Sequence, residues 1–443
     1  MKSLLFGVFY CRKASKLAKT YNRNGGNMEI QRQFYLNELI RKRNNGFVKV
    51  VTGLRRCGKS YLLRTIFKNH LLSNGVSQEQ IVEMAFDEYD NKEYCDPNTF
   101  YNFSKRKLEE HPGFIFLLDE IQLLNDFESV LNGLLSRKAE IYATGSNAKF
   151  LSKDIITEFR GRGDEIHMAP LSFAEYLSAF NDDKFSRFQE YMLYGGLPPV
   201  ALTTEVEDKM AILNSLYTET YLRDIVGRNK IRKGAELEDL LDILSSNIGS
   251  MVNPDRLQKI FHSVKKSSIT SATITKYISF LEDAYLLEEA QRYDIKGNAY
   301  MESPLKYYYS DIGLRNARLH FRQLEDSHSM ENIVYNELRH RQFNVDIGQV
   351  IVSEKNENGV YCRKQLEVDF VANKGSKRYY IQSAYMIPDE NKREQEIRPL
   401  MKIDDSFKKI VVTLHTPAPL YDNHGILTMS IFDFLLNPDS LDF

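Results

Sequence analysis

Several common features are missing from this chain of 443 residues, and each absence excludes a class of protein. The four cysteines, Cys11, Cys57, Cys95 and Cys362, are too scattered for a zinc site or a disulfide framework, which fits a reducing cytoplasm. No apolar run reaches the ~18 residues that a membrane span requires. The net charge is −1, so the chain has no overall basic character, and any nucleic-acid binding needs a local patch.

The composition is that of a folded protein with several domains. Hydrophobic residues make up 42% and aromatic residues 12%, which is enough for real cores, and the length suggests about three domains. The first 28 residues differ from the rest, because residues 1–27 carry six Lys or Arg and no acid. Two interpretations of them stay open: a disordered basic tail, or an over-extended gene start with true initiation at Met28.

Residues 53–60 form a complete phosphate-binding loop with the sequence Gly-Leu-Arg-Arg-Cys-Gly-Lys-Ser. A β-branched run precedes it and residues with helical spacing follow it, so a strand, a loop and a helix N-terminus together make an anion site. We expect Lys59 to reach the β- and γ-phosphates and the Ser60 hydroxyl to bind Mg²⁺. The residues expected to bind the nucleotide are Gly53, Leu54, Arg55, Arg56, Cys57, Gly58, Lys59, Ser60 and Tyr61. The alternative is a glycine-rich turn without a ligand.

A second expected strand ends in two acids. The apolar run from Phe114 to Leu118 leads into Asp119 and Glu120, which is how a buried parallel strand brings carboxylates to its C-terminal edge. We expect Asp119 to hold Mg²⁺ through water, and Glu120 to polarise the attacking water as general base. Taken alone, the same pattern also fits a strand that ends in two solvated acids.

The next expected strand runs from Glu140 to Thr144, and a Gly-Ser-Asn segment follows it. Ser146 or Asn147 is predicted to sense the γ-phosphate, with an ordinary turn as the alternative. Further on, Arg162, with Arg160 second, is predicted to act as an arginine finger in cis or in trans, with solvated loop arginines as the alternative. Because no Asn-Lys-x-Asp guanine signature occurs, we expect ATP and not GTP.

These motifs together resemble those of the AAA-type ATPases. More narrowly, they resemble a prokaryotic family that joins such a module to a C-terminal domain of poorly defined function. The segments most specific to that family are Pro170-Leu171-Ser172-Phe173-Ala174-Glu175-Tyr176 and Gly195-Gly196-Leu197-Pro198. Further matches are Leu117-Leu118-Asp119-Glu120-Ile121-Gln122, Thr144-Gly145-Ser146-Asn147-Ala148, Gly161-Arg162 and Tyr221-Leu222-Arg223-Asp224-Ile225. The resemblance covers roughly half of the chain and implies ATP and Mg²⁺ as cofactors.

The pattern of strands and helices predicts an α/β fold. Residues 29–170 alternate strands and helices, which indicates a phosphate-loop ATPase core with a parallel sheet. Residues 171–235 are mostly helical and resemble the small helical lid of AAA modules. In residues 236–320 the order of three helices and a strand is that of a winged helix. The helices are expected at Leu237 to Leu244, Pro254 to Val264 and Ser271 to Ala284. The third helix exposes few Arg or Lys, so DNA contact and a scaffold role both stay open.

Residues 321–443 resemble the restriction-endonuclease-like, or PD-(D/E)XK, fold. In that fold an acid on a helix, an Asp on one strand and an acid-x-Lys on the next gather around Mg²⁺. Glu337 and Asp369 match the first two positions, whereas Gln382 and Ala384 stand where the second acid and the Lys belong. Because Gln carries no charge and Ala cannot orient water, we expect a nuclease-like domain that is inactive and serves binding.

The sequence therefore predicts an ATP-binding, ATP-hydrolysing switch that couples nucleotide state to a DNA or protein partner. Two alternatives stay open. One is an ATP-regulated, metal-dependent DNA nuclease, and the other is a binding module whose fold the nucleotide only stabilises. Whether subunits form a homo-oligomer also stays open, and the arginine-finger assignment depends on it.

Overall fold

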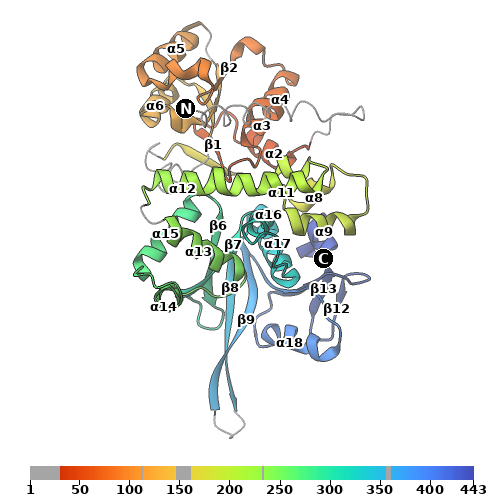
Figure 1. Cartoon of the computed structure of the whole chain (residues 1–443). Coiled ribbons are helices and arrows are strands. Elements are labelled where there is room, and N and C mark those ends of the chain that lie inside the picture. The colour runs from red at the N-terminus through yellow and green to blue at the C-terminus, as the bar shows by residue number, and fades with distance from the viewer. Residues whose placement is uncertain (1–29, 111–112, 146–160, 232–233, 356–360) are drawn as a thin grey trace.

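The structure is a computed structural model, and it describes residues 30–110, 113–145, 161–231, 234–355 and 361–443. The basic N-terminal segment, with its two interpretations, lies outside these ranges. Figure 1 shows an N-terminal α/β unit at the top, a long helical segment across the middle and a C-terminal region below. Within the described ranges, every helix is too short or too polar to cross a lipid bilayer.

The N-terminal unit is built on a parallel sheet with the strand order β2-β3-β4-β1-β5. The strands are β1 (Val48–Thr52), β2 (Ile81–Ala85), β3 (Ile115–Asp119), β4 (Glu140–Thr144) and β5 (Gly163–His167). The first four confirm the predicted strands and the parallel α/β sheet. The sequence did not reveal β5, because Gly-Asp-Glu-Ile-His has a single apolar residue and no β-branched run.

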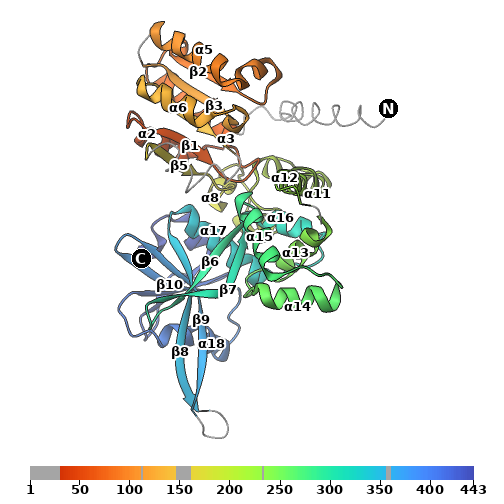
Figure 2. The ribbon, with the colours of Figure 1, turned by 90° about the vertical axis from the view of Figure 1, so that its left-hand side faces the viewer.

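Helices cover both faces of this sheet (Figure 2), which is why its central strands are almost entirely apolar. On one face lie α5 (Pro97–Glu110) and α6 (Phe127–Ser136). On the other lie α2 (Gln33–Arg41) and one continuous helix made of α3 (Lys59–Tyr61), the π-helical η1 (Leu62–Phe67) and α4 (Lys68–Ser73). Short 3₁₀ turns occur at η2 (Gln78–Gln80), η3 (Tyr89–Cys95) and η4 (Ile121–Leu123).

The next segment is helical, as predicted. It contains α8 (Phe173–Leu177), α9 (Lys184–Tyr194), α10 (Pro198–Ala201), α11 (Val206–Ser215), η6 (Leu216–Leu222) and α12 (Arg223–Arg228). The run from α11 to α12 is the long helical segment of Figure 1. The predicted break follows α9, where Gly195 has a φ of +75° and a Cβ would lie 2.2 Å from Asp311 Oδ1. Asp311 is the N-cap of α16 (Ile312–Arg318) and accepts a hydrogen bond from Gly196 N at 2.7 Å. The Gly-Gly turn is thus fixed on that helix.

Three helices and a strand follow in the predicted order, and a second strand that was not predicted pairs with the first as a hairpin. They are α13 (Gly234–Ser246), α14 (Pro254–Val264), α15 (Ser271–Asp283), β6 (Leu287–Asp294) and β7 (Ala299–Tyr309). Asn253 caps α14 as expected, since its side chain accepts hydrogen bonds from Asp255 N and Arg256 N. The hairpin does not stand alone as a wing, because β6 pairs in parallel with β8. The predicted boundary at residue 320 therefore falls within one continuous structural unit.

The C-terminal sheet is mixed, with the order β12-β13-β11-β10-β9-β8-β6-β7. Its remaining strands are β8 (Asn344–Lys355), β9 (Tyr361–Lys374), β10 (Lys377–Ala384), β11 (Lys408–Thr413), β12 (Leu420–Tyr421) and β13 (Ile426–Ser430). The helices around it are α17 (Asp326–His340), α18 (Glu390–Met401) and α19 (Ile431–Leu436), with a last turn at η7 (Ser440–Asp442). The far ends of β8 and β9 project from the molecule as a two-stranded hairpin (Figures 1 and 2).

Candidate functional site

The phosphate loop joins the C-terminal end of β1 to the helix that begins at Lys59. Its two glycines have φ angles of +130° at Gly53 and +105° at Gly58, in the left-handed region that favours glycine. A Cβ on Gly53 would lie 2.1 Å from the backbone oxygen of Met168. The loop conformation therefore requires glycine at Gly53 for space as well as for backbone angle.

Lys59 and Ser60 lie inside the loop and at its exit. The Lys59 side chain is buried, and its Nζ donates hydrogen bonds to the carbonyls of Gly53 and Leu54 at 3.0 Å each. The Ser60 hydroxyl donates to Asp119 Oδ1 at 2.9 Å. The structure thus brings the predicted lysine, hydroxyl and carboxylate together at the carboxyl edge of the sheet.

The other predicted loop residues differ in burial and in their contacts. Leu54 and Cys57 are buried in the core, so only their backbone is available to a nucleotide. Arg55 forms an ion pair with Asp224 on α12, which links the loop to the long helical segment. Arg56 has a φ of 68°, and Tyr61 is 46% exposed on the first turn of the helix.

Asp119 is the centre of a small hydrogen-bond network. Besides the Ser60 hydroxyl, it accepts a hydrogen bond from Thr144 Oγ1 at 2.5 Å, and Thr144 in turn accepts from Glu120 N at 3.0 Å. Burial raises the pKa of Asp119. Glu120 has a φ of +51° and its carboxylate accepts a hydrogen bond from Gln122. The sequence analysis missed Thr144, although its place as the last residue of the strand beside β3 was a usable signal.

The donor set at Ser60 and Asp119 fits Mg²⁺. A hydroxyl and a carboxylate oxygen are the hard ligands that this ion prefers, and it commonly keeps water and phosphate oxygens as its other ligands. Among the described residues no group of three or more His, Cys, Asp or Glu side chains could hold a metal ion. A magnesium ion here would therefore be held by few protein ligands and by the nucleotide itself.

Of the predicted γ-phosphate sensors and arginine fingers, the described ranges include only Arg162. Ser146, Asn147 and Arg160 lie outside the described residues. Arg162 is described, and its carbonyl accepts a hydrogen bond from Val48 N at 2.9 Å, at the first residue of β1. The loop follows the other end of β1, about 16 Å away for five residues in a strand. Arg162 thus lies at the opposite end of β1 from the loop of its own chain, so its role as a finger stays a prediction, with the trans arrangement favoured.

A buried arginine that the sequence analysis did not identify fixes the outer side of the loop. Arg32, at the N-cap of α2, donates to the carbonyls of Cys57 at 3.2 Å and Ala169 at 2.6 Å. It also pairs with Glu175 at 3.0 Å, and Glu175 belongs to the capping box of α8 with Ser172. The Pro-Leu-Ser-Phe segment thus supports the phosphate loop. Arg32 itself carries no local signal, because its contacts with Ala169 and Glu175 join residues more than a hundred positions apart.

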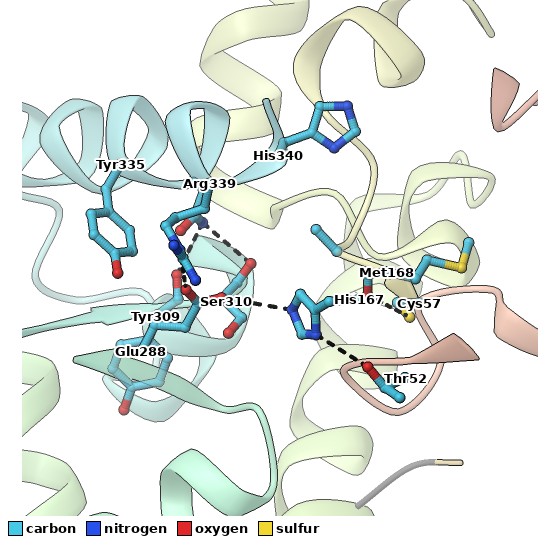
Figure 3. A network of polar contacts seen from close by, with 12 residues as sticks. Thr52, Cys57, His167, Met168, Glu288, Tyr309, Ser310, Tyr335, Arg339 and His340 are labelled. Atoms are coloured by element: carbon cyan, nitrogen blue, oxygen red, sulfur yellow. Dashed lines mark hydrogen bonds and ion pairs between the residues drawn. The ribbon is translucent and has the colours of Figure 1, made fainter. Parts of the chain in front are cut away.

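A chain of polar contacts leads from the loop into the C-terminal half (Figure 3). Thr52, the residue before Gly53, lies 3.5 Å from Nδ1 of His167, whose Nε2 is 3.8 Å from Glu288 Oε1 on β6. Glu288 accepts a hydrogen bond from Arg339 Nε on α17 at 3.0 Å. A cavity of ≈ 390 Å³ between α2, β5, β6 and α17 is lined by His167, Glu288 and Arg339.

On the other side of the cavity, Tyr35 and His340 join α2 to α17. Tyr35 on α2 contacts His340 Nδ1 at 3.1 Å and accepts a hydrogen bond from Ala169 N at 3.0 Å. Burial lowers the pKa of His340 to about 4 and lowers that of His167, although the His167 side chain keeps 38% exposure to the cavity. Both imidazoles are therefore neutral near pH 7, and the contact between the two halves depends on hydrogen bonds and packing.

The nuclease-like residues are arranged differently from the prediction. Glu337 is buried and pairs with Arg341 at 2.7 Å, whereas Asp369 accepts a hydrogen bond from Ser383 N at 2.8 Å. The helix acid whose charge acts on Asp369 is Glu331, and burial together with Glu331 raises the pKa of Asp369 well above its usual range. The expected grouping of Glu337 with Asp369 is wrong, because the two acids have separate partners.

A buried lysine already occupies the place where the carboxylates of this region converge. Lys306 on β7 lies 2.9 Å from Glu331 and 2.7 Å from Glu367, and its side chain is 3% exposed. Gln382 accepts from Asp369 N at 3.4 Å and donates to Glu396 at 3.2 Å. Ala384 is in the hydrophobic core. The Lys306 ammonium pairs with Glu331 and Glu367, and Gln382 and Ala384 supply neither the second acid nor the lysine of the motif, so the structure gives no support to a nuclease centre.

Comparison with known proteins agrees with the geometry of the N-terminal unit. Residues 45–177 match the AAA domain family, and residues 186–325 match a domain of unknown function. An uncharacterized protein from Haemophilus influenzae is 34% identical over 417 residues, covering 92% of this chain and 98% of that protein. An uncharacterized protein from Methanocaldococcus jannaschii is 29% identical, covering 87% of this chain and 85% of that protein.

Two solved structures are similar at low identity. A Walker-type ATPase of Pyrococcus abyssi has a TM-score of 0.48 and 15% identity, covering 66% of this chain and 96% of that one. The Aeropyrum pernix ORC1 protein in complex with DNA has a TM-score of 0.28 and 12% identity, covering 66% of this chain and 92% of that one. Neither similarity is strong enough to carry an argument about function. The phosphate loop, the parallel sheet and the AAA match identify the N-terminal unit as an AAA-type ATPase domain. The 34% identity over nearly the whole of both chains shows that this chain belongs to the same family as the Haemophilus influenzae protein.

Proposed function

We propose that this protein is an ATP-hydrolysing switch that couples its nucleotide state to a DNA or protein partner. The observation that carries the proposal is the contact of Ser60 with Asp119 beside the buried Lys59 at the carboxyl edge of the sheet. A lysine, a hydroxyl and a carboxylate at the exit of a glycine loop are the groups that phosphoryl transfer requires.

Each residue has a distinct role in this proposal. The Lys59 ammonium exchanges the two loop carbonyls for β- and γ-phosphate oxygens when ATP binds. Ser60 and Asp119 hold Mg²⁺, which neutralises phosphate charge when it is bound. Glu120, directly after Asp119, orients and polarises the attacking water. Thr144 holds the backbone of Glu120 in place. Arg160 or Arg162 of a second subunit is the proposed finger, so the active form is a homo-oligomer.

Coupling follows from the contacts that leave the loop. Thr52 lies between Gly53 and His167, and His167 faces Glu288 and Arg339 of the C-terminal half (Figure 3). Asp224 on the long helical segment holds Arg55 of the loop itself. A shift of the loop on ATP binding or hydrolysis is therefore transmitted both to the C-terminal half and to the long helical segment.

Steady-state ATP hydrolysis tests the proposal. We expect turnover with Mg²⁺ that is lost in Lys59→Ala together with ATP binding. Glu120→Gln should keep ATP binding but lower kcat by about 100-fold or more, as loss of a general base does. Lys105→Ala and Glu109→Gln on α5, both exposed, are the matched controls. Absence of turnover in wild type that still binds ATP would leave only the binding-module interpretation, whereas equal turnover in wild type and Glu120→Gln would remove Glu120 as the general base.

We infer that the C-terminal domain binds a partner and does not cut nucleic acid. The support is the engagement of Glu331 and Glu367 by Lys306. Incubation of DNA and RNA with the protein and Mg²⁺ or Mn²⁺ should leave both intact. Cleavage that disappears in Asp369→Ala would instead establish the ATP-regulated nuclease.

A further inference from the structure

The most exposed feature of the C-terminal half is the projecting end of the β8–β9 hairpin (Figures 1 and 2). On β9 the five residues from Tyr361 to Gln365 are all exposed, and Tyr361 reaches 68% exposure. The antiparallel register pairs Lys355 with Tyr361 and Ser353 with Arg363. The hairpin is therefore a regular two-stranded ribbon and not an irregular loop.

The two faces of the ribbon differ. Cross-strand partners lie on the same face, so Ser353, Lys355, Tyr361 and Arg363 share one face. Lys355 lies over the Tyr361 ring, with Nζ 5.2 Å from the ring centroid. The opposite face is turned toward α18, because Glu354 forms an ion pair with Arg398 of that helix. The first face is thus the one left to solvent.

The projecting ribbon is basic in a chain that has no overall basic character. Its described outer residues, 352–355 and 361–365, include Lys355, Arg363 and Lys364 and one acid, Glu354. Arg398 neutralises that acid, and the Arg398 hydrogen bond lowers the pKa of Glu354. The net charge of the whole chain is −1, so this concentration of positive charge is local.

We propose that this ribbon binds double-stranded DNA by lying in the major groove, with Ser353, Lys355, Tyr361 and Arg363 directed at the DNA. A two-stranded β-ribbon fits the major groove of B-form DNA, which is about 12 Å wide. Lys and Arg contact phosphates or guanine edges, and Ser and Tyr hydroxyls donate further hydrogen bonds. This inference rests on the proposed switch function only because it names DNA as the partner of the switch. Binding of DNA by the ribbon does not itself require ATP hydrolysis.

Two comparisons favour DNA as the occupant of this surface. A stable protein interface has an apolar, well-packed centre, whereas the apolar surface of this face is limited to the single Tyr361 ring and the half-buried Ile351 at its base. The exposed face of α15, the expected reader helix, offers only Lys276 as a cation. The ribbon therefore carries more cations than the expected reader helix does.

Fluorescence anisotropy with a labelled DNA duplex of about two helical turns tests the proposal across a series of salt concentrations. We expect salt-dependent binding by wild type. The double variant Lys355→Ala/Arg363→Ala should bind at least about tenfold more weakly. Its slope of log K against log salt should be smaller by about 2, at roughly 0.9 for each lost phosphate contact. The control Lys105→Ala/Lys107→Ala on α5 removes the same charge and should bind like wild type.

Other outcomes overturn the proposal. These are absence of duplex binding by wild type, or equal losses in the hairpin and α5 variants. Hairpin-dependent binding of an RNA duplex as tight as that of DNA would overturn the groove placement, because the A-form major groove is too narrow for a ribbon. Thermal melting of all variants checks that they are folded. The Lys59→Ala protein, measured without nucleotide, should bind DNA normally, which separates failure of this inference from failure of the switch.

Discussion

At the scale of single residues, Asp311 is an ionisable group outside the phosphate loop whose burial affects stability. Its carboxylate is buried, accepts hydrogen bonds from Gly196 N and Leu314 N, and joins the Gly-Gly turn to α16. Burial raises its pKa to about 6. In the unfolded chain the pKa is close to 4. The folded state therefore binds a proton in the interval between these values that the unfolded state has lost.

We predict that Asp311 makes the protein less stable as the pH rises from about 4 to about 6. Stability falls with pH wherever the folded state holds more protons, and a shift of this size corresponds to about 3 kcal/mol. Asp311→Asn keeps an oxygen acceptor but does not titrate, so its free energy of unfolding should lack this decrease. Urea unfolding of both proteins at several pH values measures the difference. An identical pH profile in the variant would show that the group does not titrate in this range.

Lys306 provides a second prediction at this scale. Lys306→Met leaves Glu331 and Glu367 without their buried counter-charge, so the free energy of unfolding should fall by about 3 to 5 kcal/mol. Adding Glu331→Gln to that variant should recover part of the loss, because one uncompensated charge is removed. Urea denaturation measures both variants. If Lys306→Met were as stable as wild type, the carboxylates would not depend on the ammonium.

Residues with a local signal could be predicted, and residues defined by distant partners could not. Lys59, Ser60 and Asp119 belong to short motifs whose chemistry is readable from neighbouring letters. Lys306 carries no such signal, since it meets Glu331 and Glu367 only when β7, α17 and β9 come together. For the same reason the sequence predicted Glu337, and not Glu331, as the helix acid of the nuclease motif. Both acids lie on the same amphipathic helix, and only their distant partners distinguish them.

At the scale of elements, glycines show the difference between a required and a tolerated residue. Gly227 lies exposed within α12, and a Cβ there would meet nothing within 4 Å. Gly227→Ala should therefore stabilise the protein by about 0.5 to 1 kcal/mol, through helix propensity. Gly53→Ala should instead abolish ATP binding, since its Cβ would collide with Met168. Thermal melting and nucleotide titration compare the pair, and destabilisation by Gly227→Ala would contradict the expected helical environment.

Most elements of the ATPase unit followed from periodicity, whereas sheet pairings did not. The strands β1 to β4 are short apolar runs bounded by turns, so their positions were readable. β5 was missed because pairing with β1, and not its own composition, makes it a strand. The pairing of β6 with β8 was missed for the same reason. Hydrophobic patterns locate strands, but they do not say which strands become neighbours.

At the scale of the whole molecule, the cavity between the two halves is where coupling can be measured. We predict that Glu288→Gln leaves ATP affinity unchanged but weakens the nucleotide-dependent change in hydrogen exchange of β6 and α17. The variant removes the charge that joins His167 to Arg339 without touching the phosphate loop. Glu289→Gln, its neighbour on β6, is the matched control. An unchanged exchange response in Glu288→Gln would place the coupling elsewhere, for example at the Arg55–Asp224 pair.

The shared C-terminal sheet has a mechanical consequence. Its strand β6 contacts the ATPase unit near one end, while β8, paired with β6, continues to the projecting hairpin. The twelve residues of β8 span about 40 Å as an extended strand. If the sheet rotates as a rigid body about the cavity, a turn of about 5° moves the far end by about 3 Å, close to the rise of one DNA base pair. Under the two proposals above, the sheet would thus amplify a small change at the nucleotide into a displacement comparable to one step along the proposed DNA partner.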